Sequence, residues 1–270
     1  MTKIALLGAT GRMGLTLIRA IGLTEDLELS GALAAPEDPA IGEDPGSLAG
    51  MGALGLEVCS RLDGVLPGAD VAVDFTLPSA TAANVGACAA AGLPMVMGTT
   101  GLEDDATEAL ELAARQIAVM HAPNMSVGVN LCLNLAELAA RTLGDEYDID
   151  IVEAHHRYKI DAPSGTALKL GEMVARGRGV DLAACAEHGR YGKTGERERG
   201  TIAFSSIRAG DTVGEHSVVF STEGERIEIT HKASDRMTFA QGALRAARWI
   251  VSQGPGRYGM ADVLGFESFR

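Results

Sequence analysis

The chain has 270 residues, of which 46% are hydrophobic and 22% charged, a composition typical of a folded globular protein that is long enough for two domains. Its formal net charge of −13 argues against nucleic acid as the main partner, although a local basic cluster could still bind a small anion. No apolar run approaches the ~18 residues of a membrane span, and the N-terminus lacks the pattern of a signal peptide. We therefore expect a cytoplasmic protein that binds neither membrane nor nucleic acid.

Predicted strands and helices alternate over the first 124 residues. Short apolar runs that end in glycine indicate buried parallel strands, and apolar residues at helical spacing indicate the helices between them. In chain order we predict a strand at 3–8, a helix at 11–22, a strand at 27–34, a long loop at 35–55, a strand at 70–76, a helix at 78–92, a strand at 94–101, a helix at 103–115 and a strand at 117–124. This alternation predicts an α/β fold with an N-terminal Rossmann-like, doubly wound parallel sheet.

The pattern changes after residue 124. The segments that follow are a helix at 127–144, a strand at 147–156, a helix at 165–177, a polar loop at 177–200, strands at 201–208, 215–222 and 225–233, and a final helix at 238–251. We expect the last three strands to form an antiparallel meander, and the final helix to pack on the first domain. The expected second domain is α+β on a mixed, largely antiparallel sheet; it spans 127–236, and the first domain spans 1–126 and 237–270.

A glycine-rich segment, "GATGRMG", follows the first predicted strand and opens a helix. Gly8 would permit the sharp turn, Gly11 would let the backbone approach a pyrophosphate, and Gly14 would let the helix pack on the strand. The usual dinucleotide fingerprint has glycine where this chain has Thr10. The segment predicts a dinucleotide site, and an ordinary glycine-rich turn is the alternative.

The second predicted strand lacks the acid that commonly binds the ribose of a dinucleotide at this place. Ala34 and Ala35 stand there instead. Glu37 and Asp38 follow in the loop and could substitute, whereas Arg12 could reach a 2′-phosphate. The sequence therefore leaves the choice between NADH and NADPH open.

Two later turns, "MGTTG" (97–101) and "HAPNMS" (121–126), also follow predicted strands. Ligands of doubly wound sheets bind beyond the carboxyl ends of the strands. Both turns are therefore candidates to line the nicotinamide, although each could simply cap its strand.

The stretch "EAHHRYKIDAPSGTA" (153–167) concentrates positive charge in an acidic chain. His155 and His156 are adjacent on a strand and would point to opposite faces, so we expect no metal site there. Ser164 is a predicted N-cap, and the helix start behind it is suited to a carboxylate. Lys159 and a histidine beside such a start could bind an anion and move a proton. The alternative is a structural histidine and a solvated basic loop.

Seven motifs together closely resemble the dihydrodipicolinate reductase family over almost the whole chain. They are "GATGRMG", "VDFTLP", "GTTG", "APNMSVGVN", "EAHHRYKIDAPSGTA", "GERERGTIAFSSIRAGDTVGEHSVVF" and "GERIEITHKASDRMTFAQGALRAARW". The resemblance implies an NAD(P)H-binding first domain completed by the C-terminal helix, and a second domain that binds the substrate and forms a homotetramer through its sheet. It also implies reduction of a cyclic dicarboxylate, 4-hydroxy-tetrahydrodipicolinate, to tetrahydrodipicolinate with loss of water, in the diaminopimelate and lysine pathway.

The resemblance also implies roles for single residues. The proton-transfer residues would be His155 and Lys159. The substrate carboxylates would be held by His156, Lys159, Ser164, Gly165 and Thr166. The cofactor would be lined by Gly8, Ala9, Thr10, Gly11, Arg12, Met13, Gly98, Thr99, Thr100, Ala122, Pro123, Asn124 and Met125. Relatives often carry an acid and a base where this chain has Ala34 and Ala35, and an arginine at the position of Leu77, so how the adenosine ribose is held stays open.

Two other functions remain as alternatives. A different two-domain NAD(P)-dependent reductase, such as a semialdehyde dehydrogenase, would need a nucleophilic cysteine. Cys59, Cys88, Cys132 and Cys185 are far apart, and reduced structural thiols are the simplest interpretation. A non-catalytic NAD(P)-sensing protein would have no reason to keep His155, Lys159 and the Ser-Gly-Thr helix start together.

Overall fold

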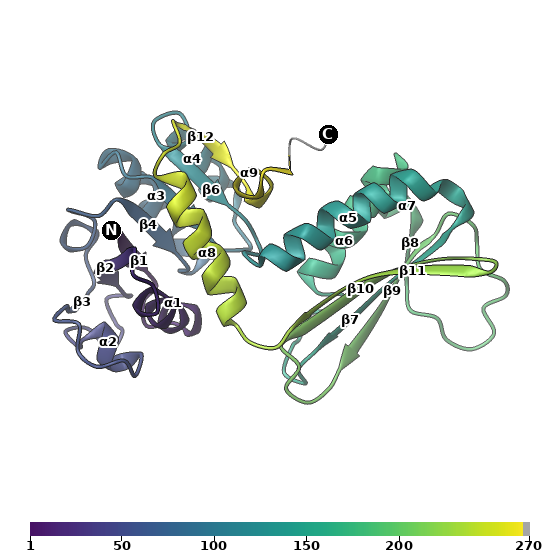
Figure 1. The fold of residues 1–270 in the computed structure, drawn as a ribbon, viewed down its shortest axis with the longest axis horizontal. Coiled ribbons are helices and arrows are strands. Elements are labelled where there is room, and N and C mark those ends of the chain that lie inside the picture. The colour runs from purple at the N-terminus through teal and green to yellow at the C-terminus, as the bar shows by residue number, and fades with distance from the viewer. Residues whose placement is uncertain (267–270) are drawn as a thin grey trace. The chain divides into compact units, whose positions relative to one another are not determined.

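The computed structural model describes residues 1–266 and divides into two compact units (Figure 1). Unit 1 comprises Met1–Val127 and the chain from Arg236 onward, and unit 2 comprises Gly128–Asp235. Among the described residues, no helix is both long and apolar enough to cross a membrane.

Unit 1 contains a seven-stranded sheet in the order β12-β6-β5-β4-β1-β2-β3, and all neighbouring strands pair in parallel. Its strands are β1 (Thr2–Leu7), β2 (Leu27–Leu33), β3 (Val58–Cys59), β4 (Val71–Asp74), β5 (Met95–Met97), β6 (Ala118–His121) and β12 (Gly256–Tyr258). The predicted parallel, doubly wound sheet is confirmed. The short edge strands β3 and β12 were not predicted, because two or three residues carry no recognisable periodicity.

Helices cover both faces of this sheet. They are α1 (Arg12–Gly22) and α8 (Met237–Ile250) on one face, and α3 (Thr81–Ala90) and α4 (Asp104–Ala113) on the other (Figure 1). Strand β1 shows why both faces need cover, because Ile4 and Leu6 join the core of the first face, whereas Ala5 and Leu7 join that of the second. The smaller elements are α2 (Pro45–Leu48), η1 (Leu62–Gly64), η2 (Pro78–Ala80) and α9 (Met260–Leu264). Helix α2 lies inside the segment expected to be a long loop.

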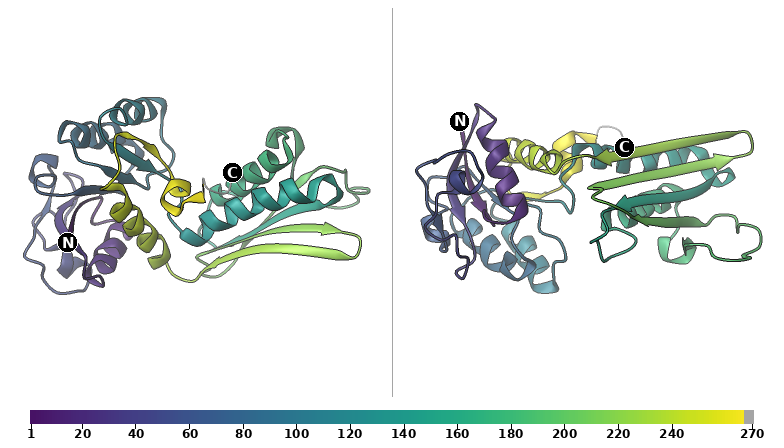
Figure 2. Two further views of the ribbon diagram at one scale, coloured as in Figure 1. Left: turned by 45° about the horizontal axis from the view of Figure 1, so that its top comes forward. Right: turned by 90° about the horizontal axis from the view of Figure 1, so that it is seen from below.

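Unit 2 is built on a five-stranded mixed sheet in the order β11-β10-β7-β9-β8. Its strands are β7 (Asp148–His155), β8 (Ala186–His188), β9 (Ile202–Arg208), β10 (Gly214–Thr222) and β11 (Glu225–Ala233). Its helices are α5 (Val127–Leu143), η3 (Gly144–Glu146), α6 (Gly165–Arg178) and α7 (Leu182–Cys185). Helices α5 and α6 lie along one face of the sheet (Figure 2).

The expected antiparallel meander of three strands is wrong for its first strand. Strands β10 and β11 form an antiparallel hairpin as predicted, but β7 lies between β10 and β9. Strand β9 pairs in parallel with β7, and β8 pairs in parallel with β9. The reason is that α6 and α7 connect β7 to β8 and β9, and such a crossover returns the chain in the same direction.

One face of β7 changes along the strand from apolar core residues to polar residues. Ile149 and Ile151 point toward the helices and are fully buried with Phe220 of β10. Glu153 and His155 continue the same row, because every second residue of a strand shares a face. Glu153 is 1% exposed although it is charged.

The contact between α8 and the rest of unit 1 gives a stability prediction. A Cβ at Gly242 would lie 1.8 Å from the backbone oxygen of Met125, so the helix and this turn leave no room for a side chain. We expect Gly242→Ala to lower the free energy of unfolding by about 2 kcal/mol or more, measured by urea denaturation.

The matched control is Gly86→Ala in α3, where a Cβ would meet no atom within 4 Å. This change should raise stability by about 0.5–1 kcal/mol, because alanine is the better helix former. Equal effects of the two substitutions would contradict the close packing of α8.

Candidate active site

The glycine turn between β1 and α1 is as tight as its sequence predicts. Gly8 has a φ of +84°, and a Cβ there would lie 2.8 Å from the backbone oxygen of Phe75. A Cβ at Gly14 would lie 2.2 Å from the oxygen of Gly8, so the helix packs directly on the turn. Gly11 has no side chain to cap α1, so the first turn of that helix can offer its N–H groups and partial positive charge to an anion.

A cavity of about 560 Å³ extends from this turn across the ends of β2 and β4. Its walls include Gly8, Ala34, Phe75 and Leu77, and its one acidic side chain is Asp38. A mainly apolar cavity beside a glycine turn suits the adenosine half of a dinucleotide.

Asp38 is held at this cavity by Thr10, the residue that departs from the usual fingerprint. The Thr10 hydroxyl donates to Asp38 Oδ2 at 2.6 Å, and the backbone N–H of Ala40 donates to Oδ1 at 2.9 Å. These hydrogen bonds lower the pKa of Asp38, so its carboxylate is ionised at neutral pH. Glu37 is exposed and does not line the cavity.

A buried carboxylate connects the ends of the next strands. Asp74 is fully buried at the end of β4 and accepts hydrogen bonds from the backbone and hydroxyl of Thr76, each at 2.7 Å, and from Asn84 at 2.9 Å. The Thr99 hydroxyl donates to the backbone oxygen of Thr76 at 3.2 Å, and the His121 ring bonds to the oxygen of Thr99 at 2.9 Å. The network thus joins the ends of β4, β5 and β6.

The structure brings the predicted cofactor residues to one edge of the sheet in unit 1. They form the glycine turn with the start of α1 (8–13), the turn after β5 (98–100) and the turn after β6 (122–125). At Gly98 a Cβ would lie 2.3 Å from the Phe75 ring, so a side chain would push into the turn. That these residues bind a nucleotide stays a prediction.

In unit 2 the predicted proton-transfer histidine belongs to a hydrogen-bonded cluster. His155 Nδ1 lies 2.6 Å from Glu153 Oε2. Arg208, from β9, binds both Glu153 oxygens at 2.8 and 2.7 Å and also donates to the backbone oxygen of Asp161 at 2.7 Å. Lys159 Nζ pairs with Asp161 Oδ1 at 2.8 Å. The pair of Glu153 and Arg208 therefore holds the segment that carries both His155 and Lys159.

Ser164 caps α6 as predicted, and its hydroxyl accepts from the backbone N–H of Ala167 at 3.2 Å. The same hydroxyl lies 2.9 Å from His216 Nε2, and the backbone N–H of Ser164 donates to Glu153 Oε1 at 3.3 Å. Gly165 and Thr166, also predicted for the substrate, are the first residues of this helix. The cluster and the helix start are thus one continuous site.

The charges of this site follow from burial and pairing. Burial alone would raise the pKa of Glu153, but hydrogen bonds from Arg208, Ser206 and His155 lower it to about 2. Burial lowers the pKa of His155, and the attraction of Glu153 offsets this only in part. Burial and the neighbouring His155 lower the pKa of His216 to about 4. At neutral pH the carboxylate is ionised and both histidines are neutral.

The remaining basic residues differ in exposure. Arg157 is exposed, and its backbone N–H donates to the oxygen of Gly210 at 3.2 Å, outside the cluster. His156 is half-buried beside the Tyr158 ring, and its Nδ1 is buried without a hydrogen-bond partner. Among the described residues no group of three or more His, Cys, Asp or Glu side chains could hold a metal ion.

Sequence reasoning missed three members of the cluster. Glu153 carried a signal, because it lies two residues before His155 on a strand and therefore on the same face. Arg208 and His216 carried none, because they reach the site from strands that are distant in sequence.

Three of the four cysteines are poorly suited to act as a nucleophile. All four are free, and burial raises the pKa of Cys88 to about 12 and also raises the pKa values of Cys132 and Cys185. A reactive cysteine needs the opposite shift. This disfavours a thiol-dependent dehydrogenase.

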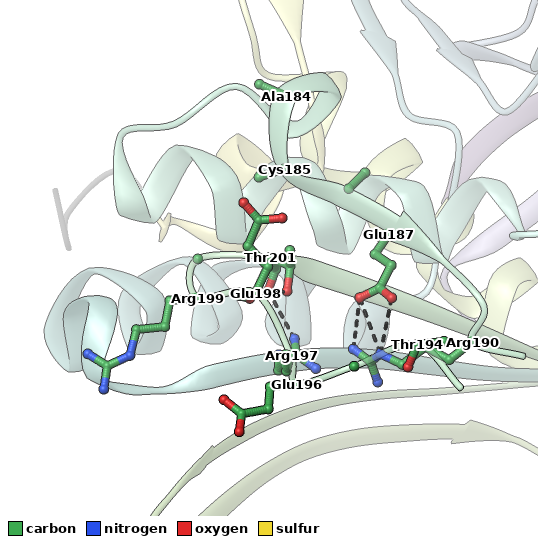
Figure 3. A pocket seen from close by; sticks show the side chains of 13 residues that line it. Ala184, Cys185, Glu187, Arg190, Thr194, Glu196, Arg197, Glu198, Arg199 and Thr201 are labelled. Carbon is green, nitrogen blue, oxygen red and sulfur yellow. Dashed lines mark hydrogen bonds and ion pairs between the residues drawn. The ribbon is translucent and has the colours of Figure 1, made fainter. Parts of the chain in front are cut away.

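A further cavity, of about 750 Å³, lies in unit 2 and is lined by residues between 184 and 201 (Figure 3). Two of its arginines are already paired: Arg190 with Glu187 at 3.0 Å, and Arg197 with Asp150 at 2.7 Å. It contains none of the predicted site residues.

The neutral state of buried His216 predicts how stability depends on pH. Its pKa falls from 6.5 to about 4 on folding, so between these values the unfolded chain binds a proton that the folded chain does not. The free energy of unfolding should therefore decrease by about 3 kcal/mol from this group as the pH falls through that range. Denaturation of His216→Gln, which does not titrate, should show a flatter curve.

Since burial also lowers the pKa values of His155, His121 and His231, some dependence should remain. The control is His188→Gln, an exposed histidine, which should leave the curve unchanged. A His216 variant that lost stability as steeply as the wild type would contradict this assignment.

Comparisons with known proteins cover nearly the whole chain. The family models described as dihydrodipicolinate reductase, N-terminus and C-terminus, match residues 2–125 and 128–264. The 4-hydroxy-tetrahydrodipicolinate reductase of Alkalilimnicola ehrlichii is 57% identical over 98% of this chain and 99% of its own. That of Methylococcus capsulatus is 53% identical over 98% of each chain.

A solved structure also matches this chain across both units. It is a dipicolinate-bound dihydrodipicolinate reductase from Paenisporosarcina sp. TG-14, with a TM-score of 0.76 and 25% identity over 97% of this chain and 99% of that one. This chain, with its glycine turn in unit 1 and its Glu153–His155–Ser164 cluster in unit 2, therefore belongs to the dihydrodipicolinate reductase family.

Proposed function

We propose that this protein is an NAD(P)H-dependent oxidoreductase that reduces 4-hydroxy-tetrahydrodipicolinate to tetrahydrodipicolinate with loss of water, in diaminopimelate and lysine biosynthesis. The observation that carries the proposal is the continuous site of His155, Lys159 and the Ser164 helix start. Relatives that share more than half of their residues with this chain are named for this activity.

The substrate is a ring with two carboxylates, and the site in unit 2 suits such an anion. The N-terminus of α6 carries a partial positive charge, and the Ser164 hydroxyl lies at its tip. Lys159 contributes a full positive charge, and His156 lies three residues before it. These groups supply local attraction that the overall charge of −13 does not.

Unit 1 fits the cofactor by its backbone and by one acid. The turn at Gly8 admits no side chain, so a pyrophosphate can approach the N-terminus of α1. Asp38 lies at the adjoining cavity, where its carboxylate can accept hydrogen bonds from ribose hydroxyls. When bound, the reduced nicotinamide supplies the hydride.

The chemical step needs one proton besides the hydride. Loss of the hydroxyl group as water leaves a conjugated ring, and hydride addition to that ring leaves an electron-rich enamine carbon that must be protonated. The ammonium group of Lys159 is the proton donor, and it must exchange its bond to Asp161 for the substrate. Once Lys159 has given its proton to the ring, neutral His155 can take up a solvent proton at Nε2 and pass it to the Lys159 amine.

The assembly proposed is a homotetramer formed through the sheet of unit 2. Helices α5 and α6 cover one face of that sheet, whereas the other face carries Val152, Val219 and the half-exposed Ile207. A one-sided sheet with apolar residues on its open face is suited to packing on another copy. The proposed location is the cytoplasm, where the four free cysteines would stay reduced.

Removing the proposed acid should separate turnover from cofactor binding. We expect Lys159→Ala to lower kcat by about 100-fold or more, because general acid catalysis contributes on this scale. The Kd for NADH, measured by fluorescence titration, should change by less than about 2-fold. Equal losses in kcat and NADH affinity would contradict the role as proton donor.

The matched control is Lys169→Ala. Lys169 lies on the exposed side of α6 and pairs with the exposed Glu172, so its loss should leave both quantities unchanged.

The proposed cofactor site should discriminate only weakly between NADH and NADPH, and Asp38 should be the residue that does so. Because no acid occupies positions 34 and 35, we expect the Kd values for NADH and NADPH to differ by less than about 100-fold, or 2.7 kcal/mol. Asp38→Ala should weaken NADH binding by about 10-fold but weaken NADPH binding less, since the carboxylate repels a 2′-phosphate. Glu37→Ala, beside it but outside the cavity, should change neither Kd. Equal effects on both cofactors would contradict this role of Asp38.

A further inference from the structure

Glu153 is the most heavily engaged side chain of the cluster, and its family resemblance assigned it no role. Its side chain is 1% exposed, and its carboxylate interacts with Arg208, His155, Ser164 and Ser206. Oε2 contacts His155 Nδ1 at 2.6 Å and Arg208 at 2.8 Å, while Oε1 accepts from Arg208 at 2.7 Å and from the Ser164 backbone at 3.3 Å. One carboxylate therefore contacts the proton-transfer residue and the start of the anion-binding helix at once.

The protonation of Glu153 decides which nitrogen of His155 carries a hydrogen. An ionised carboxylate can only accept hydrogen bonds, so His155 Nδ1 must be the donor. Neutral His155 then has its free lone pair on Nε2. Among the described residues no hydrogen bond is made to Nε2.

Gly214 keeps the space next to that nitrogen open. A Cβ at Gly214 would lie only 3.1 Å from His155 Nε2 and 3.5 Å from Cδ2 of the same ring. The ring is thus oriented through Nδ1, and Gly214 places no side chain beside Nε2.

We propose that Glu153 is the positioning residue of this site, because its carboxylate fixes His155 in the Nδ1–H tautomer with Nε2 open, and ties that ring to the Ser164 start of α6. The catalytic consequence rests on the proposed function, whereas the tautomer does not. Arg208 completes the arrangement by neutralising the buried carboxylate and by holding the backbone of Asp161, next to the Lys159 segment.

The first test measures the tautomer in the wild-type protein. Nitrogen NMR of ¹⁵N-histidine-labelled protein at neutral to alkaline pH distinguishes a protonated ring nitrogen from a bare one, and His155→Gln identifies the signals of His155. We expect a protonated Nδ1 and a bare Nε2. An Nε2–H tautomer in the wild type would overturn the proposal, and this result needs no variant of Glu153 to fold.

The second test is Glu153→Gln. The amide nitrogen of glutamine can donate to His155 Nδ1, so we expect the ring to shift toward the Nε2–H tautomer. We expect kcat to fall about 100-fold, in the range of a lost base, while the Kd for NADH in unit 1 stays within about 2-fold. Because Ser164 loses a charged acceptor, binding of pyridine-2,6-dicarboxylate should weaken by about 10-fold.

The control is Glu137→Gln on α5, which makes the same chemical change at a glutamate of unit 2 that pairs with Arg176. It should leave the His155 tautomer, kcat and dicarboxylate binding unchanged. Glu153→Asp keeps an ionised acceptor and should retain the Nδ1–H tautomer. A Glu153→Gln protein with unaltered tautomer and kcat would overturn the proposal.

The outcomes also separate this proposal from the proposed function. A protein with the expected tautomer that does not reduce the substrate would remove the reductase assignment and leave the positioning by Glu153 intact. If the wild type is an active reductase but Glu153→Gln changes neither the His155 tautomer nor kcat, the positioning role falls and the reductase assignment remains.

Discussion

The site in unit 2 depends on a charge pair that is costly to bury. A carboxylate and a guanidinium lose several kcal/mol of solvation each when they leave water, and only complete hydrogen bonding offsets this. Glu153 and Arg208 meet that condition, because they form two parallel bonds and the Glu153 carboxylate also accepts hydrogen bonds from His155, Ser164 and Ser206. Removing either partner would leave the charge of the other uncompensated. The pair therefore fixes the positions of the groups that bind it, which are His155, Ser164 and the backbone of Asp161.

The same pair also orders the exposed loop at residues 158–161. Tyr158 and Ile160 are almost fully exposed, and the intervening Lys159 would have wide freedom in an isolated loop. Arg208 binds the backbone oxygen of Asp161, and Asp161 in turn binds the Lys159 ammonium. The sheet beneath the loop, rather than the loop itself, therefore orders Lys159.

Much of this arrangement could be predicted from the sequence, and the parts that could not share a physical reason. Buried parallel strands are continuous apolar runs, so the order of strands and helices in unit 1 was accessible. The Ser164 cap was accessible because capping depends on neighbours within three residues. The parallel position of β9 beside β7 was not, since pairing partners are set by the crossover through α6. Arg208 lies 55 residues from Glu153, and no local pattern predicts such a contact.

The predicted nucleotide site also depends on a contact that the sequence did not reveal, between Thr10 and Asp38. The sequence places alanines where an acid is usual, and judged by position alone the ribose would have no partner. In the structure the loop after β2 turns back, because the backbone N–H of Asp38 donates to the oxygen of Ala35 at 2.9 Å. The Thr10 hydroxyl then donates to the Asp38 carboxylate. Two departures from the usual pattern, Thr10 and the displaced acid, thus compensate each other. Two hydrogen bonds orient this carboxylate, from the Ala40 backbone and from the Thr10 hydroxyl, and the second of them couples the position of Asp38 to the glycine turn.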